Sequence, residues 1–247
     1  MTDLQTRRLL RISGSDARDF LQGLITNDVA KLDNGLVYAA MLTPQGKYLA
    51  DFFLVPDGDA ILLDTDGDQT DSLAKRLTMY KLRADVTIEE DARTVTRGIG
   101  ATPEGAFTDP RAQALGWRAY DGTPGDDTNW TALNVDHAIP SAGIELGADS
   151  FILEMGFERL HGVDFKKGCY VGQEVTARMK HKTDLRKGLA QIQISGSAPI
   201  GTEISDERGK PAGTLYSQAN GHALAYLRFD RAKGTLNAKD AQITYAP

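Results

Sequence analysis

The most reactive side chain in this sequence belongs to Cys169, which is the only cysteine among 247 residues. Two lysines precede it, and the residues from Gly172 onward are predicted to form a helix. Ammonium groups and the partial positive charge of a helix N-terminus both favour a thiolate over a thiol. Gly168 and Gly172 permit unusual backbone dihedrals and the close approach of another molecule. These neighbours favour a reactive thiol, whereas a free cysteine considered alone is usually a buried, small apolar side chain.

Two carboxylates lie within apolar runs of the sequence. Glu154 stands between a leucine and a methionine, and Asp51 comes directly before three apolar residues. An unpaired carboxylate is penalised in apolar surroundings, so each needs a partner, ideally one that donates two parallel hydrogen bonds. For Glu154 that partner is either the edge of an amino-heterocycle or an arginine such as Arg159. For Asp51 one interpretation is a poised base or the partner of a cation, and the other is an outward-facing position on an edge strand, on the face opposite Phe52.

Other polar residues extend this set of candidates. Arg83 can bind a carboxylate or form an ion pair at a helix end. Glu174 and Arg178 are four residues apart, which suits an ordinary ion pair along a helix, and an acid in the first turn is stabilising in itself. Tyr170 is either a stacking platform for a ligand or a core aromatic. The basic residues within 178–182 form a solvated helix face or suit a polyanionic ligand tail.

Short elements are predicted to position these residues. The first 90 residues or so contain, in order, a strand, a helix, a hairpin, a strand, a helix and a strand, which is typical of an antiparallel α+β unit. The predicted ranges are 8–12, 17–25, 36–42 with 48–55, 60–64, 69–81 and 84–89. Residues 13–16 supply turn and N-cap chemistry for the first helix, and a proline and a glycine favour the hairpin turn.

The character of the sequence changes near Asp184, where we predict a domain boundary. Residues 1–183 form the α+β region, which we expect to contain two subdomains. Residues 184–247 contain short apolar segments separated by glycine, serine, aspartate or asparagine. That spacing predicts a small all-β barrel or sandwich at the C-terminus.

The composition, 41% hydrophobic and 25% charged, is that of a globular protein. A net charge of −6 argues against a nucleic-acid partner, and no apolar stretch reaches the roughly 20 residues of a membrane span. One thiol and four scattered histidines lack the spacing of a metal site, and the chain alone cannot supply the four thiolates that usually hold an iron–sulfur cluster. With a single cysteine and no signal-peptide pattern, we expect a cytoplasmic location.

The strongest resemblance to a known family lies in the cysteine segment. It contains Lys167, Gly168, Cys169, Tyr170, Val171, Gly172, Gln173 and Glu174, followed by Arg178. This segment resembles the defining motif of the YgfZ family, folate-dependent iron–sulfur assembly and repair proteins related to the T-protein (aminomethyltransferase, GcvT) of the glycine cleavage system. Weaker similarity lies at residues 20–29, 42–55, 80–83, 139–140 and 153–156. The resemblance implies a GcvT/YgfZ-like multi-domain ring, with N-terminal α+β folate-binding domains and a C-terminal β-barrel around a tetrahydrofolate channel.

The resemblance also implies a folate site made by separate segments. Glu154 matches the carboxylate that grips the pterin edge. Asp51 matches the T-protein aspartate near the folate nitrogen that receives the one-carbon unit. Arg83 and Arg178 are further candidates for folate binding, and lysines at positions 180 and 182 would help Arg178 to attract the glutamate tail.

The implied function is that of a tetrahydrofolate-binding protein in the assembly or repair of iron–sulfur clusters in client enzymes, and not of an enzyme. Cys169, as a thiolate, would exchange with a thiol or transiently accept iron or sulfide, while an assembly scaffold or a client supplies the other cluster ligands. Asp51 supports an alternative, a folate-dependent aminomethyltransferase in which this acid is catalytic. A third possibility is a folate reservoir or sensor with neither activity.

Overall fold

The computed structural model describes residues 7–181 and 185–246. These residues form two compact units. The first contains residues 7–128 and 157–177, and the second contains residues 129–156, 178–181 and 185–246. The boundary predicted near Asp184 lies outside the described residues. A segment from the middle of the chain therefore joins the C-terminal strands in the second unit.

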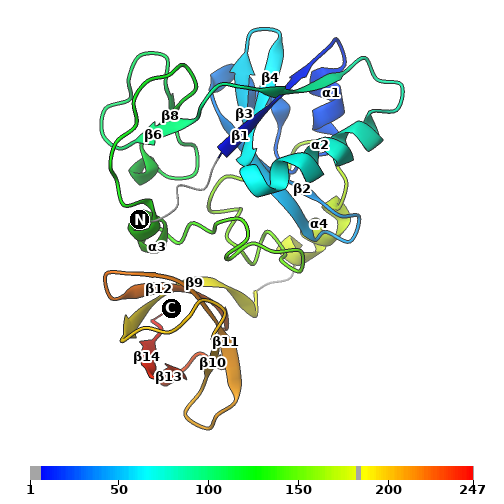
Figure 1. Cartoon of the computed structure of the whole chain (residues 1–247). Coiled ribbons are helices and arrows are strands. Elements are labelled where there is room, and N and C mark those ends of the chain that lie inside the picture. Colours follow the sequence, from blue (N-terminus) through cyan, green and yellow to red (C-terminus); the bar gives the residue numbers. More distant parts are fainter. Residues whose placement is uncertain (1–6, 182–184, 247) are drawn as a thin grey trace. The chain divides into compact units, whose positions relative to one another are not determined.

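The first unit is built on a five-stranded antiparallel sheet with the strand order β2-β3-β4-β1-β5 (Figure 1). The strands are β1 (Arg7–Ser13), β2 (Val37–Leu42), β3 (Tyr48–Asp57), β4 (Ala60–Asp66) and β5 (Thr87–Asp91). β2 and β3 form the predicted hairpin. Because β3 lies between β2 and β4, its residues occupy the interior of the sheet and not an edge.

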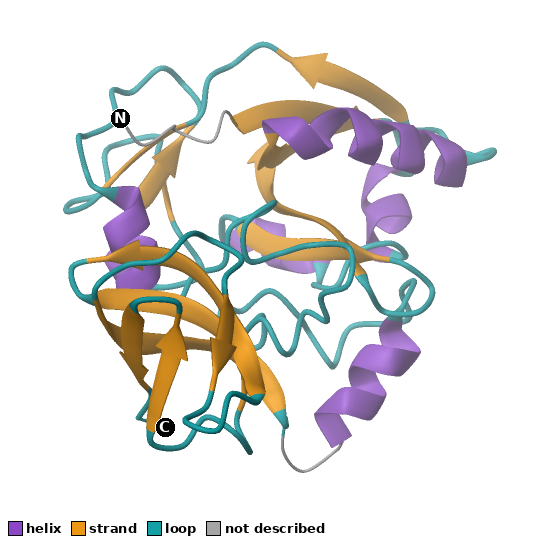
Figure 2. Cartoon of the chain, turned by 60° about the horizontal axis from the view of Figure 1, so that its bottom comes forward, coloured by secondary structure: helices purple, strands orange, loops and turns teal. Residues whose placement is uncertain are grey.

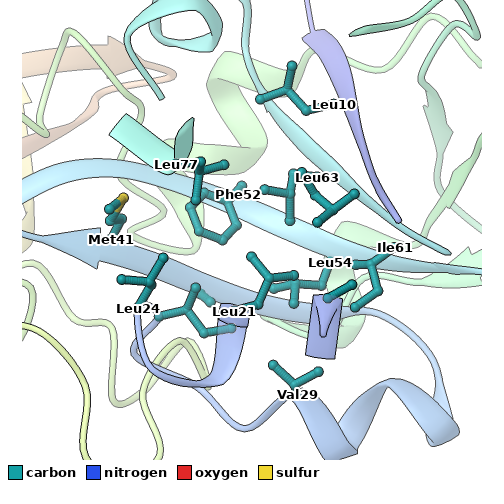
Figure 3. Close-up of a cluster of buried hydrophobic side chains, with 14 of the residues drawn as sticks. Leu10, Leu21, Leu24, Val29, Met41, Phe52, Leu54, Ile61, Leu63 and Leu77 are labelled. Atoms are coloured by element: carbon teal, nitrogen blue, oxygen red, sulfur yellow. The ribbon is translucent and has the colours of Figure 1, made fainter. Parts of the chain in front are cut away.

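One face of this sheet carries the apolar core of the unit, part of which is drawn in Figure 3. The core is completed by α1 (Ala17–Gln22), the 3-10 helix η1 (Val29–Asn34) and α2 (Gly67–Lys81). Strand alternation sends Phe52 and Leu54 to this face, and α2 adds Leu73 and Leu77 at helical spacing. Burying one such side chain stabilises the fold by about 1.5–3 kcal/mol.

Helices α1 and α2 begin differently. The side chain of Asp66 caps α2 by accepting a hydrogen bond from the backbone N–H of Asp68 at 3.0 Å. Asp16, in the segment predicted to cap α1, makes no such bond, because its carboxylate accepts from the backbone N–H of Asp85 at 2.8 Å. α1 also ends three residues earlier than predicted, since Ile25 already pairs with β2 in an isolated bridge.

A three-stranded sheet, ordered β6-β8-β7, follows in the same unit. It consists of β6 (Thr96–Gly98), β7 (Phe107–Thr108) and β8 (Trp117–Ala119), with the 3-10 helix η2 (Gln113–Leu115) between the last two. Short strands separated by loops suit the sequence of residues 101–130, which is rich in glycine and aspartate. Strand β8 of this sheet delivers Arg118 to the interior of the unit, where that residue is 3% exposed.

The second unit contains a closed six-stranded barrel, as the sequence predicted (Figure 2). Its strands are β9 (Lys187–Ser195), β10 (Glu203–Ser205), β11 (Pro211–Ala219), β12 (His222–Arg228), β13 (Thr235–Ala238) and β14 (Ala241–Thr244). Small and branched side chains such as Leu215, Ala225 and Ile243 fill its core. Helix α3 (Trp130–Asp136) contacts β11 and β12 on the outside.

Helix α4 (Gln173–His181) continues from the cysteine segment, and its last residues belong to the second unit. The sequence predicted this helix within one residue at each end. Among the described residues, no helix combines the length and the apolar character needed to cross a membrane.

Candidate functional site

Cys169 presents its thiol to solvent. It is a free cysteine and it is exposed, so the alternative of a buried, apolar cysteine is wrong. The residue lies in an irregular loop four positions before α4. Among the described residues, no group of three or more histidine, cysteine, aspartate or glutamate side chains is placed to hold a metal ion.

The lysine of the cysteine motif has a structural task. Lys167 is only 6% exposed, and its ammonium donates to the carbonyl oxygens of Gln22 at 2.6 Å and Ile25 at 2.7 Å. These carbonyls lie at and just beyond the end of α1, where the helix leaves acceptors without partners. Burial lowers the pKa of Lys167 to about 8, against the influence of nearby acids. Its bonds attach the motif to α1, whereas we predicted that this ammonium would favour the thiolate.

The two glycines of the motif differ in their surroundings. Gly172 has a φ of +86°, and a Cβ there would lie 2.6 Å from the carbonyl oxygen of Thr43. In the facing hairpin turn, Gly46 has a φ of +73°, and its Cβ would lie 2.8 Å from Cβ of Val175. Gly172 and Gly46 therefore let the motif pack directly on the β2–β3 hairpin. Gly168 has no atom within 4 Å of the corresponding position.

The remaining motif residues divide between the interior and the surface. Tyr170 is 7% exposed, and burial raises its pKa, so it is a core aromatic in this structure. Its ring lies 5.1 Å from the ammonium of Lys167. Gln173 opens α4 and is half-buried, while Glu174 and Arg178 are exposed on that helix. Lys180 is exposed there as well, and position 182 lies outside the described residues.

Asp51 lies in the middle of the first sheet. It is 6% exposed, and its two carboxylate oxygens accept hydrogen bonds from the hydroxyls of Tyr38 at 2.9 Å and Tyr48 at 2.6 Å. The Tyr48 hydroxyl also lies 3.0 Å from the side-chain oxygen of Gln69. Because a hydroxyl has one proton, Tyr48 donates to only one of these acceptors at a time. The interpretation of Asp51 as an outward-facing residue of an edge strand is therefore wrong.

A cluster of buried charges lies on the same face of the sheet. Asp64 of β4 accepts from Arg7 at 2.6 Å, from Arg118 at 2.9 Å and from the hydroxyl of Tyr120 at 3.0 Å. Arg118 also reaches Asp109 at 3.1 Å. Asp64 is fully buried and Arg118 nearly so, which makes this network costly to interrupt.

The charge cluster rests on aromatic rings that connect it to Asp51. The guanidinium carbons of Arg118 and Arg111 lie 3.9 and 4.8 Å from the ring centroid of Phe53. Arg111 also lies 5.3 Å from the ring of Tyr38, the tyrosine that donates to Asp51. Burial opposes the ionisation of Asp109, but the charges of Arg111 and Arg118 outweigh it and hold its pKa at about 2.

Sequence reasoning missed the residues of this charge cluster. Arg118 and Tyr120 alternate with apolar neighbours in the segment from Trp117 to Tyr120, which is a pattern of strand burial. That alternation could have indicated that Arg118 is buried, but it does not show which acids form ion pairs with this arginine. The tyrosines around Asp51 were not predicted. Tyr38 reaches the carboxylate through the pairing of β2 with β3, and Tyr48 lies three residues before Asp51 in β3, where the register with β2 shifts.

Glu154 belongs to the second unit. It is half-buried in a turn, and its Oε2 accepts a hydrogen bond from the hydroxyl of Tyr226 at 2.6 Å. Burial, and then the hydrogen bond and charge of Glu154, raise the pKa of Tyr226 well above its ordinary value. The backbone N–H of Leu189 donates to the carbonyl oxygen of Glu154 at 2.7 Å. This tyrosine was not among the partners that the sequence suggested.

The candidates divide between the two units. Asp51, Cys169 and Arg83 lie in the first, and Glu154 and Arg178 lie in the second. Arg83 is exposed and follows Leu82, which has a positive φ of 46° after the end of α2.

The fold defines the class of protein. A crystal structure of the glycine cleavage system aminomethyltransferase T from Bartonella henselae matches with a TM-score of 0.75 over 99% of this chain and 84% of that chain, at 12% sequence identity. The GcvT-like fold predicted from the cysteine motif is therefore confirmed. Residues 186–247 match the C-terminal beta-barrel domain of CAF17.

The relatives then give the family. The mouse mitochondrial iron–sulfur cluster assembly factor IBA57 is 30% identical over 97% of this chain and 80% of its own length. The human protein is 27% identical over the same shares. An IBA57 homolog from Pyricularia oryzae is 31% identical over 76% of this chain, which spans 56% of that longer relative. This chain belongs to the IBA57 family of iron–sulfur cluster assembly factors.

The names of these relatives correct one prediction. They are described as mitochondrial proteins, which contradicts the cytoplasmic location inferred from the sequence. The inference failed because a single cysteine excludes an internal disulfide but does not distinguish between compartments that keep thiols reduced.

Proposed function

We propose that this protein acts in iron–sulfur cluster assembly through the thiol of Cys169, as the YgfZ type of motif implies. The observation that carries the proposal is the exposure of this one thiol within an anchored segment. Lys167 attaches the segment to α1, and Gly172 packs it on the hairpin. A cysteine needed only for packing would lie in the interior, as most free cysteines do.

A thiolate is both a nucleophile and a ligand for iron. When Cys169 loses its proton to solvent and donates an electron pair to iron, another ligand leaves the metal, and no oxidation state changes. One thiolate cannot hold a cluster by itself. The remaining ligands would come from a scaffold or a client enzyme, so Cys169 acts while such a partner is bound.

The test is complementation in cells that lack their own copy of this protein. We expect Cys169→Ala to abolish the activity of a four-iron client enzyme, with normal folding and abundance of the variant. The control is Lys75→Ala, which removes an exposed lysine of α2, outside the cysteine motif. Full client activity with Cys169→Ala would contradict the proposal.

We also propose that the T-protein-like fold binds tetrahydrofolate through Glu154. The residues fit this ligand, because an ionised carboxylate offers about four lone-pair positions and the Tyr226 bond uses one of them. A planar pair of pterin N–H groups can bond in parallel to such a carboxylate. Bound folate would supply nitrogens that carry a one-carbon unit, and Glu154 would hold the edge of its pterin ring.

Calorimetric titration with tetrahydrofolate under reducing conditions tests this second proposal. We expect saturable binding that Glu154→Ala weakens by about tenfold or more, which is about 1.4 kcal/mol. The control is Glu203→Ala, an exposed acid of the same unit. Absence of binding to the wild type would refute the folate proposal and leave the role of Cys169 to be explained through a protein partner.

The burial and double tyrosine contact of Asp51 favour one alternative, a folate-dependent aminomethyltransferase. Its signature is conversion of tetrahydrofolate to a methylene derivative. That turnover would be lost in Asp51→Asn and unaffected by Cys169→Ala.

A further inference from the structure

We propose that the β9–β12 strand pair of the barrel positions Glu154, with Tyr226 as the positioning residue. This inference rests on the proposed folate role of Glu154 and assigns the barrel a part in the same site. Tyr226 acts through the carboxylate and does not itself need to touch the ligand.

Glu154 is attached to the barrel at both its backbone and its side chain. Its carbonyl oxygen accepts from the N–H of Leu189 in β9 at 2.7 Å, and its carboxylate accepts from the hydroxyl of Tyr226 in β12 at 2.6 Å. Leu189 and Tyr226 are direct partners in the antiparallel register of these strands. A single pair of facing residues in the barrel therefore binds both the backbone and the side chain of Glu154.

The neighbouring residue in β9 makes this close approach possible. A Cβ at Gly188 would lie 2.9 Å from the carbonyl oxygen of Glu154 and 3.2 Å from the ring of Phe229. No larger residue fits there without moving the backbone that carries the acid. The absence of a side chain at Gly188 therefore allows the turn that carries Glu154 to pack closely against the barrel.

Such attachment matters because Glu154 lies in a turn segment, outside any helix or strand. A glutamate side chain has several rotatable bonds, and ordering them on binding reduces affinity. The short bond to Tyr226 selects one orientation before a ligand arrives. A hydrogen bond to an ionised group is also stronger than a neutral one, so it maintains the carboxylate as an acceptor.

A double-mutant cycle on tetrahydrofolate affinity tests the proposal. We expect Tyr226→Phe to weaken binding by about tenfold when Glu154 is present and to have little further effect in a Glu154→Ala background, because Tyr226 acts through the acid. The matched control is Tyr216→Phe, a half-buried tyrosine of the adjacent strand β11. Equal weakening by Tyr226→Phe in both backgrounds would overturn the positioning role.

An absorbance titration of the tyrosines supplies a readout that needs no folate. Since Glu154 raises the pKa of Tyr226, one tyrosine should ionise at lower pH in Glu154→Gln than in the wild type. An unchanged titration would show that the bond does not persist in solution and would overturn the inference. If the titration shifts but the wild type binds no folate, the bond is real, and both the folate proposal and the positioning role built on it are refuted. If Glu154→Ala weakens binding but Tyr226→Phe does not, only the positioning role fails.

Discussion

Asp51 and Glu154 both accept hydrogen bonds from tyrosine hydroxyls, but the two carboxylates are buried to different extents. In both cases the carboxylate comes from an apolar run of the sequence. Asp51 is nearly inaccessible and has a tyrosine on each oxygen, whereas Glu154 is half-buried and has one such bond in the structure. An acid in an apolar run therefore indicates a specific hydrogen-bond partner, and its burial decides how much of the stability of the fold depends on that partner.

The largest expected effect lies in the charge cluster beside Asp51. Asp64→Ala leaves Arg118 and Arg7 without their shared carboxylate, and we expect it to lower the free energy of unfolding by about 3–5 kcal/mol. Urea denaturation measures the change. The control is Asp57→Ala, whose ion pair with Arg93 is more exposed and should contribute no more than about 1 kcal/mol. Equal losses of stability in the two variants would contradict the expectation that the buried ion pairs of Asp64 contribute more than the more exposed pair of Asp57.

The tyrosines allow a direct comparison of the two carboxylates. Tyr48→Phe removes a donor from a buried carboxylate, and we expect a cost of about 1–3 kcal/mol. Tyr226→Phe should cost less than about 1 kcal/mol, because water can reach the half-exposed Glu154. Urea denaturation of the two variants at neutral pH checks both values. A larger loss with Tyr226→Phe would reverse the ranking of the two sites.

The first unit also buries the ammonium group of Lys167, which predicts a pH dependence of stability. Lys167 has a pKa of about 8 in the folded protein and 10.5 in its ordinary state. Between these values the unfolded state binds more protons, so the free energy of unfolding should rise with pH through that window, at most about 1.4 kcal/mol per unit.

The change is measured as the difference between the wild type and Lys167→Met, which cancels other titrations. From about pH 7.5 to about 9.5, we expect the wild type to gain on the order of 1 kcal/mol relative to the variant. Parallel curves for the two proteins would show that Lys167 keeps its proton in the fold.

The smallest effect on stability is expected at Cys169. Because the thiol is exposed, Cys169→Ala should change the free energy of unfolding by less than about 0.5 kcal/mol. The native thiol should also react with a thiol-specific reagent nearly as fast as the denatured protein does. Slow labelling of the native protein would place the thiol inside and weaken the proposed function.

Much of the fold was predictable because local patterns specify it. The β2–β3 hairpin, helix α2 and helix α4 follow from alternation, helical periodicity and turn residues, and the spacing of short apolar segments indicated the barrel. Capping was less predictable, since Asp16 bonds to residue 85 and not to its own helix. Whether a polar side chain serves its neighbours in sequence depends on which segment arrives beside it.

The cysteine motif and the two acids in apolar runs are local features, so the order of amino acids alone indicates the class of protein and the candidate residues. What those residues contact depends on the folded chain. In the folded protein, Cys169 is exposed to solvent and Lys167 donates to a carbonyl oxygen at the end of α1. Folding also brought Tyr38 to Asp51 and Tyr226 to Glu154. The physical reason is that exposure and hydrogen bonding depend on strand register and on contacts between distant segments, which no short stretch of sequence contains.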